Sequence, residues 1–186
     1  MSEKRNIAVI VGSLRKESFC RKSALALAEL APSNLSLSIA EIGQLSMYNQ
    51  DLDDAPPAEW LAFRDTIRAA DGVLFITPEY NRSVPACLKN AVDIGSRPYG
   101  KSAWDGKPGA VMSLTPGSQG AFGANHHLRQ SLVCLNVLTM QHPEAYFSNA
   151  STYFGADGKL VNEETKKYFT RFIESYGKWV ERLAQK

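Results

Sequence analysis

The chain alternates short apolar runs with longer amphipathic stretches, and this alternation constrains its fold more than any other feature. The first run, residues 7–11, is apolar on both faces, which is typical of a buried parallel strand. Similar runs follow at 73–76, 110–112 and 137–140, while residues 35–39 alternate with serine like an edge strand. Stretches with helical spacing separate these runs. Repeated strand–helix order predicts a parallel sheet with helices on both faces.

Five such strand–helix units follow one another without a linker, an internal repeat or a low-complexity tract. Helical spacing is clearest near the end, where aromatic and aliphatic residues form one stripe between 169 and 183. We therefore expect a single domain, 1–186, built on a doubly wound five-stranded parallel sheet. In such sheets ligands bind beyond the carboxyl ends of the strands. The turns after the first, third and fourth strands are where we look for function.

Composition argues against several other classes of protein. The net charge of +2 is too small and too scattered for a nucleic-acid groove or a membrane-surface patch. Three widely spaced cysteines without a Cys-x-x-Cys pair indicate neither a disulfide framework nor a zinc site, and they fit a reducing compartment. His126 and His127 are neighbours that point about 100° apart on a helix, so we expect no metal site. The run 7–11 is too short for a signal core or membrane span, so we expect a cytoplasmic protein.

The turn after the first strand reads Gly-Ser-Leu-Arg-Lys-Glu-Ser, residues 12–18, and leads into a helix. Free backbone N–H groups and the positive end of the helix dipole bind anions at such a position. Arg15 can add a charge-assisted hydrogen bond to a phosphate. The turn matches neither the dinucleotide Gly-x-Gly-x-x-Gly pattern nor the NTPase phosphate loop, which favours a mononucleotide. Taken alone, it is equally compatible with an ordinary helix start, with Ser18 as N-cap and Arg15 in solvent.

The turns after the third and fourth strands carry a second set of signals. Residues 77–85, Thr-Pro-Glu-Tyr-Asn-Arg-Ser-Val-Pro, are stiffened by two prolines, so their backbone can border a flat heterocycle with Tyr80 beside the ring. Residues 115–123 hold three glycines and a proline, which lets the backbone approach a ligand closely. This loop is longer than the ~2–6 residues usual for such turns. A plain loop and a flexible connection are the alternatives.

Together these segments resemble the NADPH-dependent FMN reductase family, and within it the bacterial quinone and chromate reductases. The resemblance lies in residues 12–18 and 77–85, in Leu-Lys-Asn-Ala-Val-Asp at 88–93, in His-Leu-Arg-Gln-Ser-Leu at 127–132, and in Pro-Glu at 143–144. It spans nearly the whole chain. It implies a flavodoxin-like fold, bound FMN, NAD(P)H as cosubstrate, and a homodimer or homotetramer with flavin sites near the interface.

The resemblance also implies a flavin site, residue by residue. The FMN phosphate loop corresponds to Ser13, Arg15, Ser18, Phe19 and Cys20. The segment that borders the isoalloxazine ring corresponds to Pro78, Glu79, Tyr80 and Asn81. The loop on the other side of the ring corresponds to Thr115, Pro116, Gly117 and Gly120. The chain departs from the family at Cys20, where asparagine is frequent, so a phosphate contact there comes from the backbone. It departs again at Arg82, where an aromatic residue is common.

The leading functional hypothesis is an enzyme that passes electrons from NAD(P)H through FMN to a quinone, or to chromate, azo or nitro compounds. The cofactor performs this chemistry, which explains why no catalytic constellation is visible, and we predict no catalytic side chain. Arg82 and Arg97 are candidate anchors for the nicotinamide phosphates. One alternative is a flavodoxin-type single-electron carrier, although such carriers are strongly acidic. Another is a sensor of flavin redox state. Steady NAD(P)H oxidation distinguishes the enzyme from both.

Overall fold

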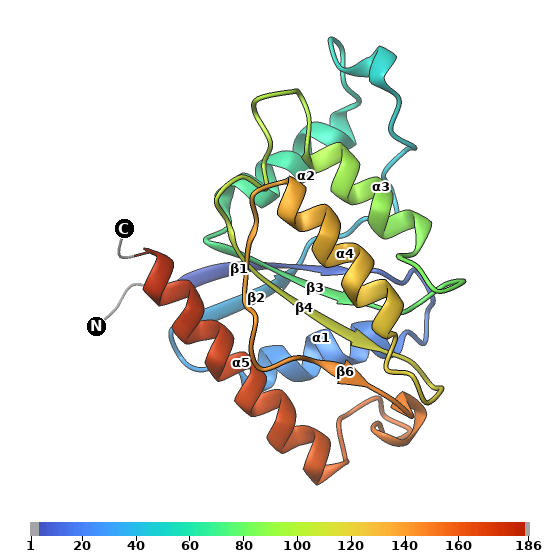
Figure 1. Cartoon of the computed structure of the whole chain (residues 1–186). Coiled ribbons are helices and arrows are strands. Elements are labelled where there is room, and N and C mark those ends of the chain that lie inside the picture. Colours follow the sequence, from blue (N-terminus) through green and yellow to red (C-terminus); the bar gives the residue numbers. More distant parts are fainter. Residues whose placement is uncertain (1–3, 185–186) are drawn as a thin grey trace.

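The structure is a computed structural model, and it describes residues 4–184. Its centre is a parallel sheet with the strand order β2-β1-β3-β4-β5 (Figure 1). The strands are β1 Arg5–Val11, β2 Leu35–Ile39, β3 Gly72–Thr77, β4 Pro108–Leu114 and β5 Leu138–Thr139. Parallel pairing in this order confirms the flavodoxin-like doubly wound sheet that the sequence predicts.

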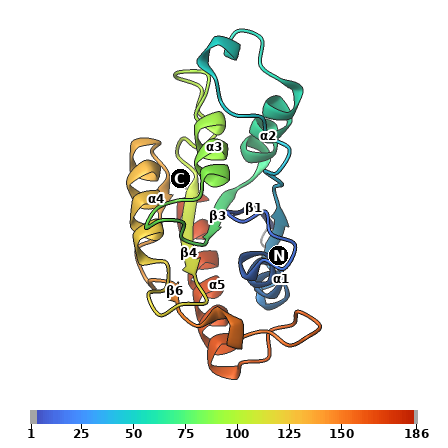
Figure 2. The ribbon, with the colours of Figure 1, turned by 90° about the vertical axis from the view of Figure 1, so that its right-hand side faces the viewer.

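Helices cover both faces of the sheet, as expected. They are α1 Phe19–Leu30, α2 Ala58–Ala69, α3 Ala86–Gly95, α4 Phe122–Cys134 and α5 Glu163–Ala184, with short 3₁₀ turns η1 Gln50–Leu52 and η2 Ala150–Thr152. Helices α1 and α5 lie on one face, and α2, α3 and α4 lie on the other (Figures 1 and 2). Among the described residues, no helix combines the length and apolar character that a membrane crossing requires.

The period-two geometry of the strands divides the core into two clusters. In β1, Ile7 and Val9 are buried in the cluster that contains α1 and α5. Ala8 and Ile10 point the other way, into the cluster that contains α2, α3 and α4. Residues 72–77 of β3 are likewise buried throughout. Burial on both faces explains why the central strands read as continuous apolar runs.

The far edge of the sheet differs from the sequence expectation in one respect. The predicted fifth strand at 137–140 is present, but β5 pairs only with the first two residues of β4. A further strand that the sequence does not predict, β6 Tyr146–Phe147, pairs with Ser113 and Leu114 at the other end of β4. This pairing brings Tyr146 to the carboxyl edge of the sheet, beside the loop that follows β4.

Candidate functional site

The turns that follow β1 and β3 pack together at the carboxyl edge of the sheet. The Gly12 N–H donates to the Ile76 carbonyl at 2.8 Å, and the Cys87 thiol of α3 contacts the Gly12 carbonyl at 3.7 Å. A Cβ atom at position 12 would lie 2.9 Å from Leu88 Cδ2 and 3.1 Å from Thr77 Oγ1. Glycine is therefore needed here for close packing. The turn after β1 therefore starts in contact with β3 and α3, the two elements on either side of the turn after β3.

The turn after β1 leaves its backbone donors free. In the described part of the chain, the N–H groups of residues 13–17 donate no hydrogen bond to a protein acceptor. Ser18 caps α1 by accepting a hydrogen bond from the Arg21 N–H at 3.2 Å, which confirms the predicted N-cap. The first turn of α1 contains no acidic residue, and Arg15 is exposed. Free donors, a positive helix end and a nearby guanidinium fit the phosphate of FMN.

The next two residues of the predicted phosphate loop are the first two of α1. Cys20 is 2% exposed, and its burial raises the pKa of the thiol to about 12. The thiol is therefore neutral and enclosed, so only the backbone of this residue can meet an anion. The half-buried Phe19 ring stacks on Phe154, with ring centroids 6.2 Å apart.

The turn after β3 is a tight hairpin. Tyr80 and Ser83 exchange two backbone hydrogen bonds, of 3.1 and 3.0 Å. The residues between them, Asn81 and Arg82, have φ values of 50° and 66°, which defines a type I′ turn. Asparagine adopts this left-handed conformation readily, whereas arginine does so rarely. The turn holds the Tyr80 side chain half exposed at the rim.

Glu79 connects this hairpin to α4. Its side chain is 11% exposed, and Oε2 accepts a hydrogen bond from the Ala124 N–H at 3.0 Å. The helix has no N-cap side chain at Ala121, so this carboxylate satisfies one of its free donors. A Cβ atom at Gly123 would lie 2.7 Å from the Arg82 carbonyl oxygen. The carboxylate thus connects the β3 hairpin to the start of α4.

Several hydrogen bonds connect the loop after β4 to itself and to the neighbouring strands. The Thr115 N–H donates to the Phe147 carbonyl at 3.0 Å, and Thr115 Oγ1 accepts from the Gly117 N–H at 3.2 Å. Gly120 has a φ of 59°, and its carbonyl accepts from Ser113 Oγ at 2.8 Å. Pro116 and Gly117 remain exposed at the tip. These contacts tie both ends of the loop to β6 and to β4.

A cavity of about 620 Å³ opens between this loop, the β3 hairpin and β6. Its lining residues are Arg82, Ser118, Gln119, Gly120, Phe122, Gly123, Tyr146 and Ser148. The volume lies in the range of small-molecule sites. Of these residues, the sequence predicts Gly120 as part of the flavin site and Arg82 as a candidate anchor for the nicotinamide phosphates. The one sequence signal that could have indicated the rest is the aromatic Phe122 inside a glycine-rich loop at the carboxyl edge.

Three aromatic rings form one wall of this cavity and its support. The Phe122 ring centroid lies 4.2 Å from that of His126 and 5.1 Å from that of Tyr146. The Tyr146 hydroxyl donates to Glu144 Oε1 at 3.0 Å and lies 3.0 Å from His126 Nε2. Burial, with Glu144 nearby, raises the pKa of Tyr146, so its phenol stays neutral. Within residues 4–184 no metal-binding cluster of histidine, cysteine or acidic residues occurs.

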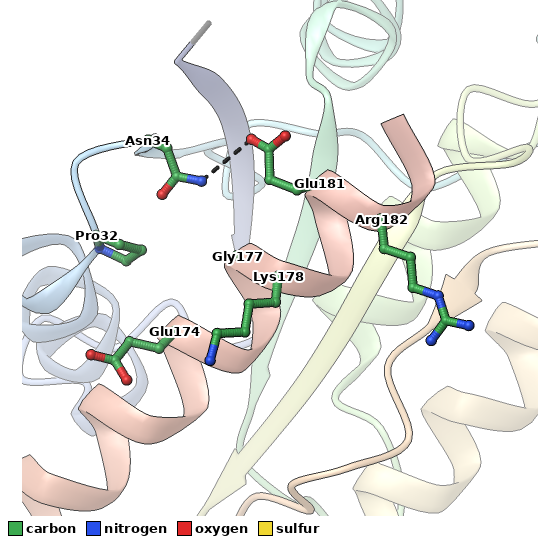
Figure 3. Close-up of a pocket in the computed structure, with 7 residues that line it drawn as sticks. All are labelled: Pro32, Asn34, Glu174, Gly177, Lys178, Glu181 and Arg182. Carbon is green, nitrogen blue, oxygen red and sulfur yellow. Dashed lines mark hydrogen bonds between the residues drawn. The ribbon is translucent and has the colours of Figure 1, made fainter. Parts of the chain in front are cut away.

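A second groove of about 620 Å³ lies at the opposite edge of the sheet (Figure 3). It runs between the segment before β2 and the last turns of α5, where Asn34 Nδ2 donates to Glu181 Oε1 at 3.3 Å. Glu174, Lys178 and Arg182 surround it with both signs of charge. Because parallel sheets bind ligands at their carboxyl edge, the three loops and the cavity beside them form the candidate site.

Comparison with known proteins shows which proteins this chain is similar to. A family model described as NADPH-dependent FMN reductase matches residues 5–152. A protein named quinone reductase from Pseudomonas putida is 58% identical over 181 residues, 97% of each chain. A 2-hydroxy-1,4-benzoquinone reductase from Burkholderia sp is 46% identical over 174 residues, 94% of this chain and 95% of the other. The solved structure of FerB, a flavoenzyme NAD(P)H:(acceptor) oxidoreductase from Paracoccus denitrificans, has a TM-score of 0.90 and 40% identity, covering 96% of this chain and 98% of that one.

Proposed function

The chain belongs to the NADPH-dependent FMN reductase family, and we propose that it reduces quinones with electrons from NAD(P)H. It is an oxidoreductase, with FMN as cofactor and NAD(P)H as electron donor. The balanced reaction takes NAD(P)H, one proton and a quinone to NAD(P)⁺ and a hydroquinone. Bound FMN supplies the two-electron chemistry. The family relationship and the quinone reductase relatives support the quinone as acceptor.

The observation that carries the proposal is the row of free N–H groups at residues 13–17, at the start of α1. These donors and Arg15 would hold the phosphate of FMN, with Ser18 keeping the helix end in shape. The backbone of residues 78–81 and 115–117 would flank the ring system. The side chains of the site bind and orient, and none of them is required to attack or to abstract a proton.

Several finer statements form part of the same proposal. The acceptor range extends from quinones to chromate, azo and nitro compounds, because the acceptor side is an open cavity rather than a shaped pocket. We place the protein in the cytoplasm, which the absence of a cysteine framework supports. We further propose that residues 1–186 form one domain that assembles as a homodimer or homotetramer. The exposed apolar side chain of Val133 on α4 supports such association.

The purified protein tests the central claim directly. It should be yellow and should release FMN, not FAD, on denaturation, because the phosphate turn suits a single phosphate group. A colourless protein that does not bind added FMN would contradict the proposal. A protein that binds FMN but consumes no NAD(P)H with any acceptor would instead be a single-electron carrier.

Initial rates with both substrates varied test the catalytic scheme. One open side of the site must serve donor and acceptor in turn, so the oxidised nicotinamide leaves before the quinone enters. Parallel double-reciprocal lines are the expected result. Intersecting lines would show that both substrates bind together, and a single shared site would be refuted.

A further inference from the structure

The cavity beside the β3 hairpin combines a cation with an aromatic wall. Arg82 lines one side, and Phe122 and Tyr146 line another. Ser118 and Ser148 add polar atoms, and none of the lining residues described by the structure is acidic. A guanidinium recognises an anionic oxygen by charge-assisted hydrogen bonds, and aromatic faces recognise planar rings. The combination fits a flat ring that carries one negative oxygen.

The Arg82 guanidinium is free to serve a ligand. Its backbone is fixed by the type I′ turn and by close contact with Gly123, so the side chain leaves the chain at a defined point. The guanidinium is 71% exposed, and in residues 4–184 its ion-pair partner is Glu79, at a long 3.4 Å. Glu79 already accepts the shorter hydrogen bond from the Ala124 N–H. An exposed, weakly paired guanidinium loses little when it turns to an acceptor.

The tyrosine of the cavity offers its ring rather than its hydroxyl. The Tyr146 hydroxyl is engaged by Glu144 and His126, and its raised pKa keeps it neutral. Phe122 is about half exposed and has no polar group. The aromatic wall therefore gives affinity for a ring without reading its substituents. Discrimination between a charged and a neutral acceptor falls to Arg82.

We propose that Arg82 is a specificity-determining residue that selects acceptor quinones carrying an ionised hydroxyl group, and that Phe122 and Tyr146 seat their ring. This inference rests on the proposed function. In the reaction the quinone still gains two electrons and two protons to become the hydroquinone. NAD(P)H supplies both electrons and one of the protons, and solvent supplies the other proton. Arg82 holds the ionised oxygen throughout and neither gives nor takes a proton.

The experiment compares two quinones on the FMN-loaded enzyme. 2-Hydroxy-1,4-naphthoquinone is an anion at neutral pH, and 2-methoxy-1,4-naphthoquinone is its neutral counterpart. Arg82→Gln should raise KM for the hydroxyquinone about 10- to 100-fold and leave KM for the methoxyquinone and both kcat values unchanged. Arg82→Lys should retain part of the preference, because lysine keeps the charge but not the planar fork.

The matched control is Arg68→Gln. Arg68 pairs with Asp65 three residues earlier, as Arg82 pairs with Glu79, but it lies on α2. It should behave like the wild type with both quinones. A second readout avoids turnover: 1-hydroxy-2-naphthoate, a planar anion that is not reduced, should bind the wild-type holoenzyme by calorimetry and lose about tenfold or more in affinity with Arg82→Gln.

Three results would overturn the inference. Equal KM increases for both quinones would mean that Arg82 acts through the shape of the turn. No change for either quinone would mean that the guanidinium stays in solvent. A selective increase in KM for NADPH would make Arg82 an anchor for the nicotinamide phosphate. If the wild type reduces no quinone although FMN is bound, the proposed function fails instead, and naphthoate binding still tests the cavity.

Discussion

Replacing Glu79 by alanine should remove the side-chain hydrogen bond that connects the β3 hairpin to the start of α4. The carboxylate is 11% exposed and accepts the Ala124 N–H at 3.0 Å, at a helix end that no other side chain in the described residues caps. A hydrogen bond to a charged group contributes ~1.5–3 kcal/mol, and loss of an N-cap costs ~0.5–2 kcal/mol. These two figures describe the same contact and are not additive. The long, exposed ion pair with Arg82 adds little.

The expected loss for Glu79→Ala is therefore about 2 kcal/mol in the free energy of unfolding. In a chain of this size it corresponds to a decrease of roughly 4–8 °C in the melting temperature. Glu79→Gln keeps an acceptor oxygen and loses the charge, so it should lose about half as much. A freed hairpin must be ordered again when FMN binds, which costs ~1–2 kcal/mol per residue, or about tenfold in Kd.

Thermal unfolding of the flavin-free proteins and fluorescence titration with FMN measure the two effects. The control is Glu164→Ala, an exposed acid in the first turn of α5, where Asn162 already accepts the Thr165 N–H at 2.9 Å. It should change stability by less than ~0.5 kcal/mol. If the Glu79 and Glu164 variants melt together and bind FMN equally well, the carboxylate does not hold the turn.

The same structure makes four further predictions. Arg15→Ala should weaken FMN binding by roughly one to two decades without lowering the melting temperature of the flavin-free protein, and unchanged flavin affinity would place Arg15 in solvent. Gly12→Ala should weaken FMN binding, because the new Cβ would lie 2.9 Å from Leu88 Cδ2 and 3.1 Å from Thr77 Oγ1 and would force the turn or these side chains to shift; an alanine variant that titrates normally would contradict this. Thiol reagents at neutral pH should modify the exposed Cys134 first, Cys87 more slowly and Cys20 only on unfolding. Because burial raises the pKa of Cys20 from 9.0 to about 12, the native state keeps a proton that the unfolded chain loses, so stability should fall by up to about 1.4 kcal/mol per pH unit above pH 9, and a Cys20→Ala variant should lack this slope in urea unfolding.

The sequence predicts the central strands well because strands buried on both faces consist of continuous apolar runs. The runs at 7–11 and 73–76 lie inside β1 Arg5–Val11 and β3 Gly72–Thr77. Strand β6 contains no such run, because it has two residues and is defined by its pairing with β4. A pair of residues is too short for any period to be read. Its position depends on the chain returning to the end of β4, which local sequence does not specify.

The parts of the site also differ in whether local sequence or distant contacts determine them. The loops could be located from sequence because they follow the strands, and parallel strands bring their carboxyl ends to one edge. The contact between Glu79 and Ala124 spans 45 residues and depends on where α4 begins. The carboxylate of Glu79 was therefore read as part of a ring-bordering segment, while its observed partner is a helix N–H. Tyr146 was missed for the reason that β6 was missed.

The backbone and the side chains have different roles at this site, which explains why the sequence contains no set of catalytic residues. Around the proposed flavin site the side chains hold the chain itself: Ser18 caps α1, Glu79 caps α4, and Thr115 closes its own loop. In the turn after β1, the groups left free are the backbone N–H groups of residues 13–17, which any residue can supply provided the turn has the right shape. The cavity reverses this arrangement, because there Arg82 and Phe122 present their side chains to solvent. Substitutions that reshape the loops should therefore act on FMN binding, whereas substitutions at the cavity should act on the choice of acceptor. A chain of this kind can change its acceptor without disturbing the site that holds its cofactor.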